Sequence, residues 1–319
     1  MKKYFSKENI CWIIFAAVIF TLITFLMNVG VIGSYYQITL YNICINVILA
    51  VSLNLIIGVC GQFSLGHAGF MCIGAYSAAI VVRSMSNLLG FALGVGIGIV
   101  ISTIAALIVS IPTLRLRGDY LAIATLGFSE IIRIIVLNLK ITNGAAGLSG
   151  IAKLTTWPLL FVLMVASIVI VTNFSRSRQG RACISIREDE IASEAMGINT
   201  TRYKTTAFVI GAALASVAGA LYACNSYVIK PDLFTFNKSI DILVMVVFGG
   251  MGSMTGSVIA AAFIGVLNML LQNFSSIRMV IYGVVLVAIM IFRPGGLLGT
   301  KEFTFSALLH RKRKEKGRK

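Results

Sequence analysis

Most of this chain consists of apolar runs long enough to cross a lipid bilayer, separated by short polar or glycine-containing segments. A transmembrane helix needs roughly 17–25 predominantly apolar residues. Backbone inside a bilayer must satisfy its own hydrogen bonds, which a helix does. The sequence therefore predicts an all-α, polytopic membrane protein with about ten transmembrane helices. The predicted spans are 10–33, 36–58, 68–82, 89–113, 119–137, 156–173, 204–229, 238–250, 256–273 and 276–293.

The composition supports this class and argues against several others. Hydrophobic residues make up 58% of the chain and charged residues 12%, against about 25% charged residues in soluble domains. The net charge of +16 does not indicate nucleic-acid binding, because the basic residues lie in short loops and the tail. The six cysteines show no pairing pattern and no C-x-x-C, so we expect neither a disulfide framework nor a metal or cofactor site. They are Cys11, Cys44, Cys60, Cys72, Cys183 and Cys224.

The distribution of basic residues predicts the orientation, because cytoplasmic loops are enriched in lysine and arginine. With the N-terminus inside, the loops assigned to the outside hold only Arg83, Lys140, Lys153, Lys230, Lys238 and Arg278. We treat the N-terminal run as a retained first helix, since it lacks a small-residue cleavage site. The predicted parts are a cytoplasmic N-terminus (1–9), spans one to six (10–174), a cytoplasmic loop (175–203), spans seven to ten (204–299) and a basic cytoplasmic tail (300–319).

The loop from Ser175 to Lys204 is the one long polar interruption of the sequence. Ser185 and Glu188 have the S-x-x-E spacing of a capping box. The acids that follow favour the first turns of a helix, where the dipole attracts negative charge. Gly197 is placed to end this helix in a left-handed conformation. One reading is a solvated loop that only satisfies topology; the other is a helix that presents Ile191 and Met196 to a cytoplasmic partner.

Two glycine-rich segments interrupt the predicted spans, at Gly61–Phe70 and Gly249–Gly256. Interrupted spans of this kind often mark a substrate pathway in transporters. The alternative is that both are tight turns whose glycines allow close helix packing. In the first segment the polar residues Gln62, Ser64 and His67 favour a pathway or gating role; a lone histidine would not.

The fifth span carries the polar residues Thr125, Glu130 and Arg133. Ionisable groups inside a span cost roughly 2.5–3.5 kcal/mol each on insertion scales and normally face protein or water. Glu130 and Arg133 are separated by three positions on a helix, so they can pair with each other. Structural pairing and a polar wall of a transport route both remain open at this point.

Several motifs, in order, resemble the permeases of branched-chain amino-acid ABC importers, in particular their LivM-type member. The resemblance covers about residues 40 to 299. It is carried by GQFSLGHAGF (Gly61–Phe70) with Ile73–Tyr76, GDYLAIATLGFSEIIR (Gly118–Arg133), TNGAAGL (Thr142–Leu148), GRACISIREDEIASEAMGIN (Gly180–Asn199), GGMGSMTG (Gly249–Gly256) and FRPGGLLG (Phe292–Gly299).

This resemblance implies a permease subunit in a bacterial plasma membrane that carries leucine, isoleucine and valine. Its implied partners are a second, LivH-type permease, two cytoplasmic ATPases and an extracytoplasmic binding protein that provides most of the selectivity. Related permeases carry urea and short amides, so the substrate stays open. The resemblance also implies that 175–203 is a coupling loop. Its implied ATPase-coupling residues are Glu188, Asp189, Glu190, Ile191, Glu194, Ala195, Met196 and Gly197.

Two other function classes are less consistent with the sequence. A secondary transporter needs intramembrane acids for ion coupling, and only Glu130 and Asp241 qualify. An intramembrane enzyme lacks support because neither H-E-x-x-H nor G-x-S-x-G occurs. No G-x-x-x-x-G-K-[ST] occurs either, so ATP hydrolysis would need a partner. The residues predicted to line the translocation path are Gln62, Ser64, His67, Thr125, Glu130 and Arg133.

Overall fold

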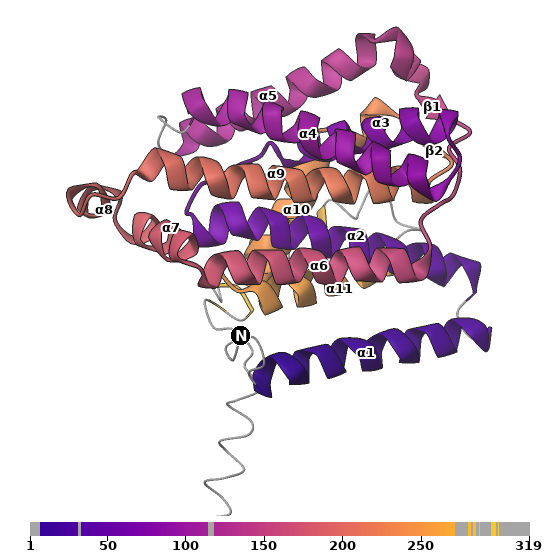
Figure 1. Cartoon of the computed structure of the whole chain (residues 1–319), viewed down its shortest axis with the longest axis horizontal. Helices are drawn as coiled ribbons and strands as arrows, with labels where there is room; N and C mark the ends of the chain where they lie inside the picture. The colour runs from indigo at the N-terminus through magenta and orange to yellow at the C-terminus, as the bar shows by residue number, and fades with distance from the viewer. Residues whose placement is uncertain are drawn as a thin grey trace, which may run out of the picture. The chain divides into compact units, whose positions relative to one another are not determined.

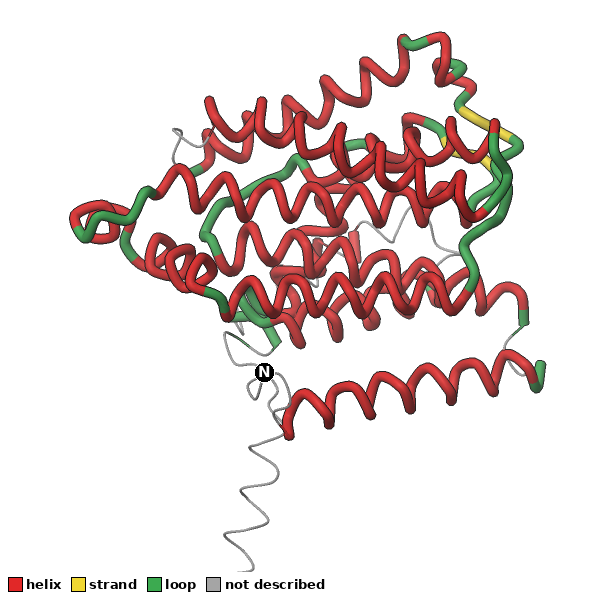
Figure 2. Tube along the Cα trace, in the orientation of Figure 1, coloured by secondary structure: helices red, strands yellow, loops and turns green. Residues whose placement is uncertain are grey.

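The computed structural model describes residues 7–30, 33–113, 118–271 and a few later positions (280–281, 283–284, 287, 295–297 and 299). These residues form helices and one short two-stranded sheet (Figure 2). The helices are α1 (Lys7–Asn28), α2 (Ser34–Asn54), α3 (His67–Ser84), α4 (Leu88–Thr113), α5 (Asp119–Asn138), α6 (Trp157–Arg176), α7 (Arg178–Glu188), α8 (Glu190–Ala195), α9 (Thr200–Asn225), α10 (Phe236–Gly249) and α11 (Met254–Leu270). The strands are β1 (Leu148–Ser149) and β2 (Val228–Ile229).

Short helical turns complete the described part. A π-helical turn, η1 (Leu55–Val59), continues α2, and three 3₁₀ turns lie in the loops: η2 (Lys140–Thr142), η3 (Gly144–Ala146) and η4 (Pro231–Phe234). The chain divides into two units, residues 1–38 with 301–319 and residues 39–300. The first unit contains the apolar helix α1, and the second contains most of α2 and every later helix and strand named here.

The helices follow the predicted apolar runs closely. Nine of the ten predicted spans coincide with α1 to α6 and α9 to α11, and most of the tenth, 276–293, lies outside the described residues. Five described helical segments are long and apolar enough to cross a membrane: 35–59, 88–113, 119–138, 157–176 and 200–225. This confirms an all-α membrane protein.

The core of the second unit is built by α2, α3 and α9. Consecutive residues of α2 from Ile48 to Leu53 are fully buried. Helix α3 packs against α9 at small residues: a Cβ at Gly74 would lie 1.9 Å from the Ser216 carbonyl oxygen, and one at Gly219 would lie 2.0 Å from the Met71 carbonyl oxygen. Small residues allow this close approach of helix backbones in membranes. The outer helices α4, α5 and α6 are instead largely exposed along their apolar faces, as expected of helices that face lipid or another subunit.

The two ends of the second unit carry different elements: the short sheet lies at one end, and α7 and α8 lie at the other (Figure 1). At one end β1 pairs antiparallel with β2, with Leu148 opposite Ile229, so the glycine-rich loop after α5 is tied to the segment after α9. At the other end α7 and α8 extend beyond the long helices. The loop after α5 and the segment after α9, both predicted to be external, therefore lie at the end opposite the loop predicted to be cytoplasmic. Arg115, Arg117 and the basic tail, which contributed to the orientation, lie outside the described residues.

Candidate functional site

The polar loop between α6 and α9 contains two helices, and this corrects the prediction of a single helix capped by Ser185 and Glu188. Helix α7 begins after Ser177, whose hydroxyl oxygen accepts a hydrogen bond from the Gly180 N–H at 3.1 Å. It ends at Glu188, and Asp189 is extended (φ −155°, ψ 111°). The Asp189 carboxylate caps α8 by accepting from the Ala192 N–H at 3.0 Å. Ser185 lies inside α7, so its hydroxyl is too late in that helix to act as an N-cap.

Helix α8 ends in the left-handed glycine that the sequence predicts. Gly197 has φ +83°, a conformation that glycine adopts without steric cost. Its N–H donates to the Glu194 carbonyl at 2.9 Å, and the Ile198 N–H donates to the Ser193 carbonyl at 3.1 Å. These two bonds form a Schellman motif, which satisfies the last carbonyls of the helix. The short helix is therefore fixed at both ends.

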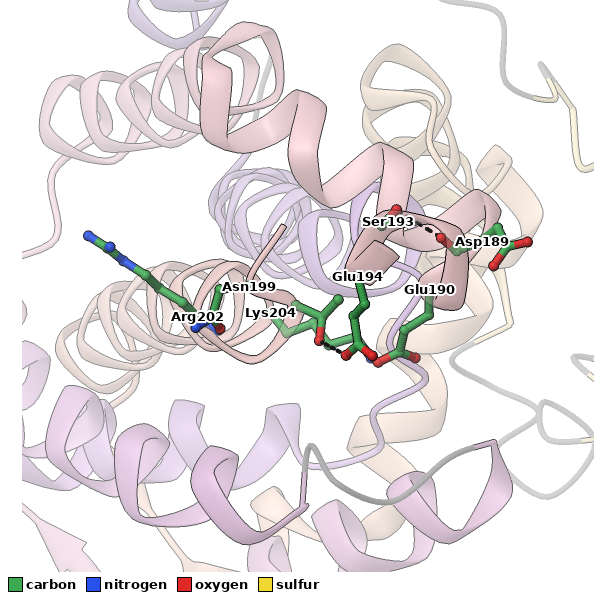
Figure 3. Close-up of polar contacts among 8 residues, drawn as sticks. Asp189, Glu190, Ser193, Glu194, Asn199, Arg202 and Lys204 are labelled. Atoms are coloured by element: carbon green, nitrogen blue, oxygen red, sulfur yellow. Dashed lines mark hydrogen bonds and ion pairs between the residues drawn. The ribbon is translucent and has the colours of Figure 1, made fainter. Parts of the chain in front are cut away.

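Polar contacts hold one side of α8 against its neighbours (Figure 3). The Glu190 carboxylate pairs with the Lys204 ammonium of α9 at 2.6 Å, and the Lys204 side chain is only 11% exposed. Glu194 accepts a hydrogen bond from the Thr200 hydroxyl at 2.7 Å. The hydroxyls of Ser193 and Ser185 lie 2.9 Å apart and join α8 to α7. These acids therefore anchor α8 to its own chain.

The other side of α8 is apolar and open. Ile191 is 68% exposed and Met196 is 83% exposed, and Ala195 between them is exposed as well. Glu188, at the end of α7, pairs with the neighbouring Arg187 instead of joining this surface. The structure thus presents two large apolar side chains on a helix whose polar side is already bonded.

The glycine-rich segment before α3 brings four of the predicted path residues into the interior. Gln62, Ser64, His67 and Thr125 are all at most 2% exposed. The Thr125 hydroxyl oxygen accepts from the Leu65 N–H at 3.0 Å, which holds the segment against α5. The His67 Nε2 atom lies 2.7 Å from the Ser52 hydroxyl of α2. Residues 61–66 are non-helical, as predicted, and α3 begins at His67.

Three polar atoms in this segment have no hydrogen-bond partner within the described part of the chain: Nε2 and Oε1 of Gln62, and Nδ1 of His67. Leaving a buried polar group unpaired costs about 1–3 kcal/mol. Such groups therefore call for a specific explanation. The chemistry available here is hydrogen bonding, with no described group of metal-binding residues.

Glu130 and Arg133 of α5 form the ion pair that their spacing allows. The Arg133 Nε atom lies 2.7 Å from the Glu130 carboxylate, and the side chains are 22% and 29% exposed. A third group, Asp232 of η4, places a carboxylate oxygen 4.0 Å from Arg133 Nη1. Sequence reasoning missed Asp232 because it lies about a hundred residues away and in a loop. The pairing is established, whereas a role in the transport route remains a prediction.

A double substitution separates the structural from the functional role of this pair. Glu130→Gln should lower the stability of the purified protein by about 1–2 kcal/mol, because a half-buried guanidinium loses its main partner. Arg133→Met in addition should restore stability, since no half-buried unpaired charge then remains and the Asp232 side chain is 78% exposed. Thermal unfolding in detergent measures both, with the exposed Arg83→Met as control. If Glu130→Gln is as stable as the control variant, the pair does not stabilise the fold. A stable double variant that fails to transport would place the pair in the route.

Comparison with known proteins identifies the family. The family model described as the permease component of branched-chain amino acid transport systems matches residues 35–292. The chain belongs to this family. It is 37% identical to the high-affinity branched-chain amino acid transport system permease protein LivM of Escherichia coli (strain K12), over 80% of this chain and 68% of that protein. LivM of Salmonella typhimurium matches equally well. These matches confirm the LivM-type resemblance seen in the motifs.

The chain also shows weaker similarity to a second permease protein and to one solved structure. LivH of Escherichia coli (strain K12), described as a permease protein of the same kind of transport system, is 33% identical over 46% of this chain and 47% of its own length. The solved structure of PsaBC from Streptococcus pneumoniae in complex with Fab covers 85% of this chain and 96% of its own with a TM-score of 0.45 and 15% identity. That likeness is too low to carry an argument. The permease family is therefore established by sequence, and the fold class by the helices of this chain.

Proposed function

We propose that this chain is the transmembrane permease subunit of an ATP-binding-cassette importer and forms part of the translocation path for leucine, isoleucine and valine. The observation that carries the proposal is the 37% identity to LivM over 80% of the chain. The names of the LivM and LivH relatives describe permeases of one transport system. This supports a second, LivH-type permease as a partner. We further propose two cytoplasmic ATPases and an extracytoplasmic amino-acid-binding protein, the partners that the family resemblance implies.

The segment Glu188–Gly197 is proposed to couple the permease to an ATPase. Its support is the exposure of Ile191 and Met196 beside acids that are bonded internally. A solvated loop without a partner would not need a helix capped at both ends and anchored to α9. Within this proposal Asp189, Glu190, Glu194 and Gly197 shape and orient the helix. Ile191, Ala195 and Met196 are the side chains that would enter a groove on the ATPase.

The proposed arrangement in the membrane has ten spans, with both termini and the coupling loop 175–203 in the cytoplasm of a bacterial cell. The excess of basic residues on the predicted inner side supports this orientation. So does the position of α7 and α8 at the end opposite β1 and β2. The predicted spans 10–174 and 204–299 would then form the membrane part. Recruitment of cytoplasmic ATPases by α8, tested below, also tests this orientation.

The proposed translocation path runs beside the glycine-rich segment 61–66. The unpaired polar atoms of Gln62 and His67 support this assignment, as does the burial of Ser64 and Thr125 around them. The Glu130–Arg133 pair would form a polar part of the same route on α5. These side chains offer hydrogen bonds to a polar solute, which fits a permease that receives its substrate from a selective binding protein.

Uptake into vesicles tests the proposed function. The complex of both permeases, the ATPases and the binding protein should accumulate leucine, isoleucine and valine only when ATP is supplied on the ATPase side. Urea, a short amide and a basic amino acid serve as competing substrates. Uptake by the permease alone, driven by an ion gradient, would instead indicate a secondary transporter. Accumulation of urea or the amide in place of leucine would refute the substrate assignment.

A further inference from the structure

Arg187 connects the coupling loop to the end of α2. It lies in the last turn of α7, and its Nη1 atom donates to the Gly58 carbonyl oxygen at 2.6 Å. Gly58 belongs to the π-helical turn η1, all five residues of which are buried. The last carbonyls of a helix lack partners within the helix, and a cation there is favoured by the helix dipole. Turns of this π type often occur at functional sites.

Asn54, the last residue of α2 before this turn, is bonded to the second glycine-rich segment, which joins α10 to α11. The side chain of Asn54 donates to the Ser253 carbonyl at 3.0 Å and accepts from the Gly252 N–H at 2.8 Å. The backbones of Gly58 and Gly252 are in contact, since a Cβ at Gly58 would lie 2.2 Å from the Gly252 nitrogen. Asn54 is itself fully buried, so both of its hydrogen bonds are protected from water.

The Arg187 side chain, 28% exposed, contacts glycines of both glycine-rich segments. A Cβ at Gly61 would lie 2.8 Å from Arg187 Cγ, and one at Gly252 would lie 3.1 Å from Arg187 Nη1. Both glycines have positive φ, +72° and +97°, so neither position accepts another residue without strain. The Arg187 side chain therefore lies between the two non-helical segments, with its aliphatic part against Gly61 and its guanidinium against Gly252, while its backbone belongs to the coupling loop.

We propose that Arg187 is a positioning residue that transmits displacement of α7 and α8 to the Gly58 turn and the Gly252 loop, and through them to the helices around the path. The inference rests on the proposed function, because it assumes that an ATPase moves α8. Charge-assisted hydrogen bonds are among the stronger ones in proteins, and this one joins α7 to the Gly58 turn, which is itself in contact with Gly252. Movement of α7 would either carry Gly58 and Gly252 with it or break this bond.

The test uses the assembled complex with the leucine-loaded binding protein as the stimulus. Arg187→Met keeps an aliphatic side chain and removes the donor, whereas Arg187→Lys keeps a cationic donor. Arg181→Met is the matched control, since Arg181 is an exposed residue of the same helix. We expect Arg187→Met to copurify the ATPases normally and to hydrolyse ATP at the basal rate. Its leucine-stimulated hydrolysis should fall about tenfold, within the usual range of coupling between sites. The lysine variant should be intermediate.

Two results would overturn the proposal. One is unchanged stimulation in Arg187→Met. The other is that Arg187→Met no longer copurifies the ATPases or no longer folds, and that Arg187→Lys is no better. This result would assign Arg187 a merely structural role. A separate result would show that α8 does not dock on the ATPase: normal ATPase copurification in the Ile191→Asp variant. That result does not depend on Arg187, so failure of the docking proposal can be distinguished from failure of this one. The Arg181→Met control should match the wild type in every measurement.

Discussion

Ile191→Asp and Met196→Asp should each abolish ATPase recruitment while leaving the membrane part folded. Both side chains are exposed, at 68% and 83%, so a carboxylate at either position causes no clash in the isolated chain. In the complex the carboxylate would enter an apolar groove without a partner. That costs about 3 kcal/mol, or roughly a hundredfold in affinity. Pull-down of the ATPases and substrate-stimulated ATP hydrolysis, in variants matched for expression, measure the effect.

Gln179→Asp provides the control for added charge. Gln179 is an exposed residue of α7, so the substitution places a carboxylate on the same side of the molecule but away from α8. Asp189→Ala should show a weaker form of the same defect, because it removes the N-cap of α8 at a cost of about 1 kcal/mol. Normal recruitment and coupling in both the Ile191 and Met196 variants would show that α8 is not the ATPase contact.

The sequence predicted the helices better than it predicted their connections. Nine of the ten predicted spans coincide with helices because an apolar run of sufficient length is a local property, and the left-handed Gly197 follows from local chemistry as well. The break at Asp189 was missed because the spacing of Ser185 and Glu188 also matches a capping box. Only the bond from Asp189 to Ala192 shows which residue caps the helix.

In the candidate site, too, local features could be predicted from the sequence and long-range contacts could not. Ile191 and Met196 could be predicted as exposed because they interrupt a polar segment. The contacts of Arg187 with Gly58, and of Asn54 with Gly252 and Ser253, join positions more than a hundred residues apart. Such contacts depend on how the helices pack, which periodicity does not reveal. The one local signal was Asn54 itself, a polar residue near the end of an apolar run.

Gly74→Ala should destabilise the protein strongly, although it adds a single methyl group. Gly74 belongs to the Ile73–Tyr76 motif, and a Cβ there would lie 1.9 Å from the Ser216 carbonyl oxygen and 2.5 Å from the Ser216 Cα. These are backbone atoms of a buried helix, so no side-chain rotation can relieve the overlap. Overpacking of this kind costs about 1–3 kcal/mol, and we expect the upper end because α3 and α9 must separate along their contact.

Gly127→Ala is the matched control for this effect. Gly127 lies inside α5, and a Cβ at that position would meet no atom of the described residues within 4 Å, apart from its chain neighbours and the backbone of its own helix. Alanine should therefore stabilise that helix by about 0.5–1 kcal/mol, the usual difference between the two residues in a helix interior. The midpoint of thermal unfolding in detergent should fall for Gly74→Ala and stay level or rise for Gly127→Ala. Equal midpoints would mean that α3 and α9 can separate without cost, and that the glycine of the motif serves something other than their packing.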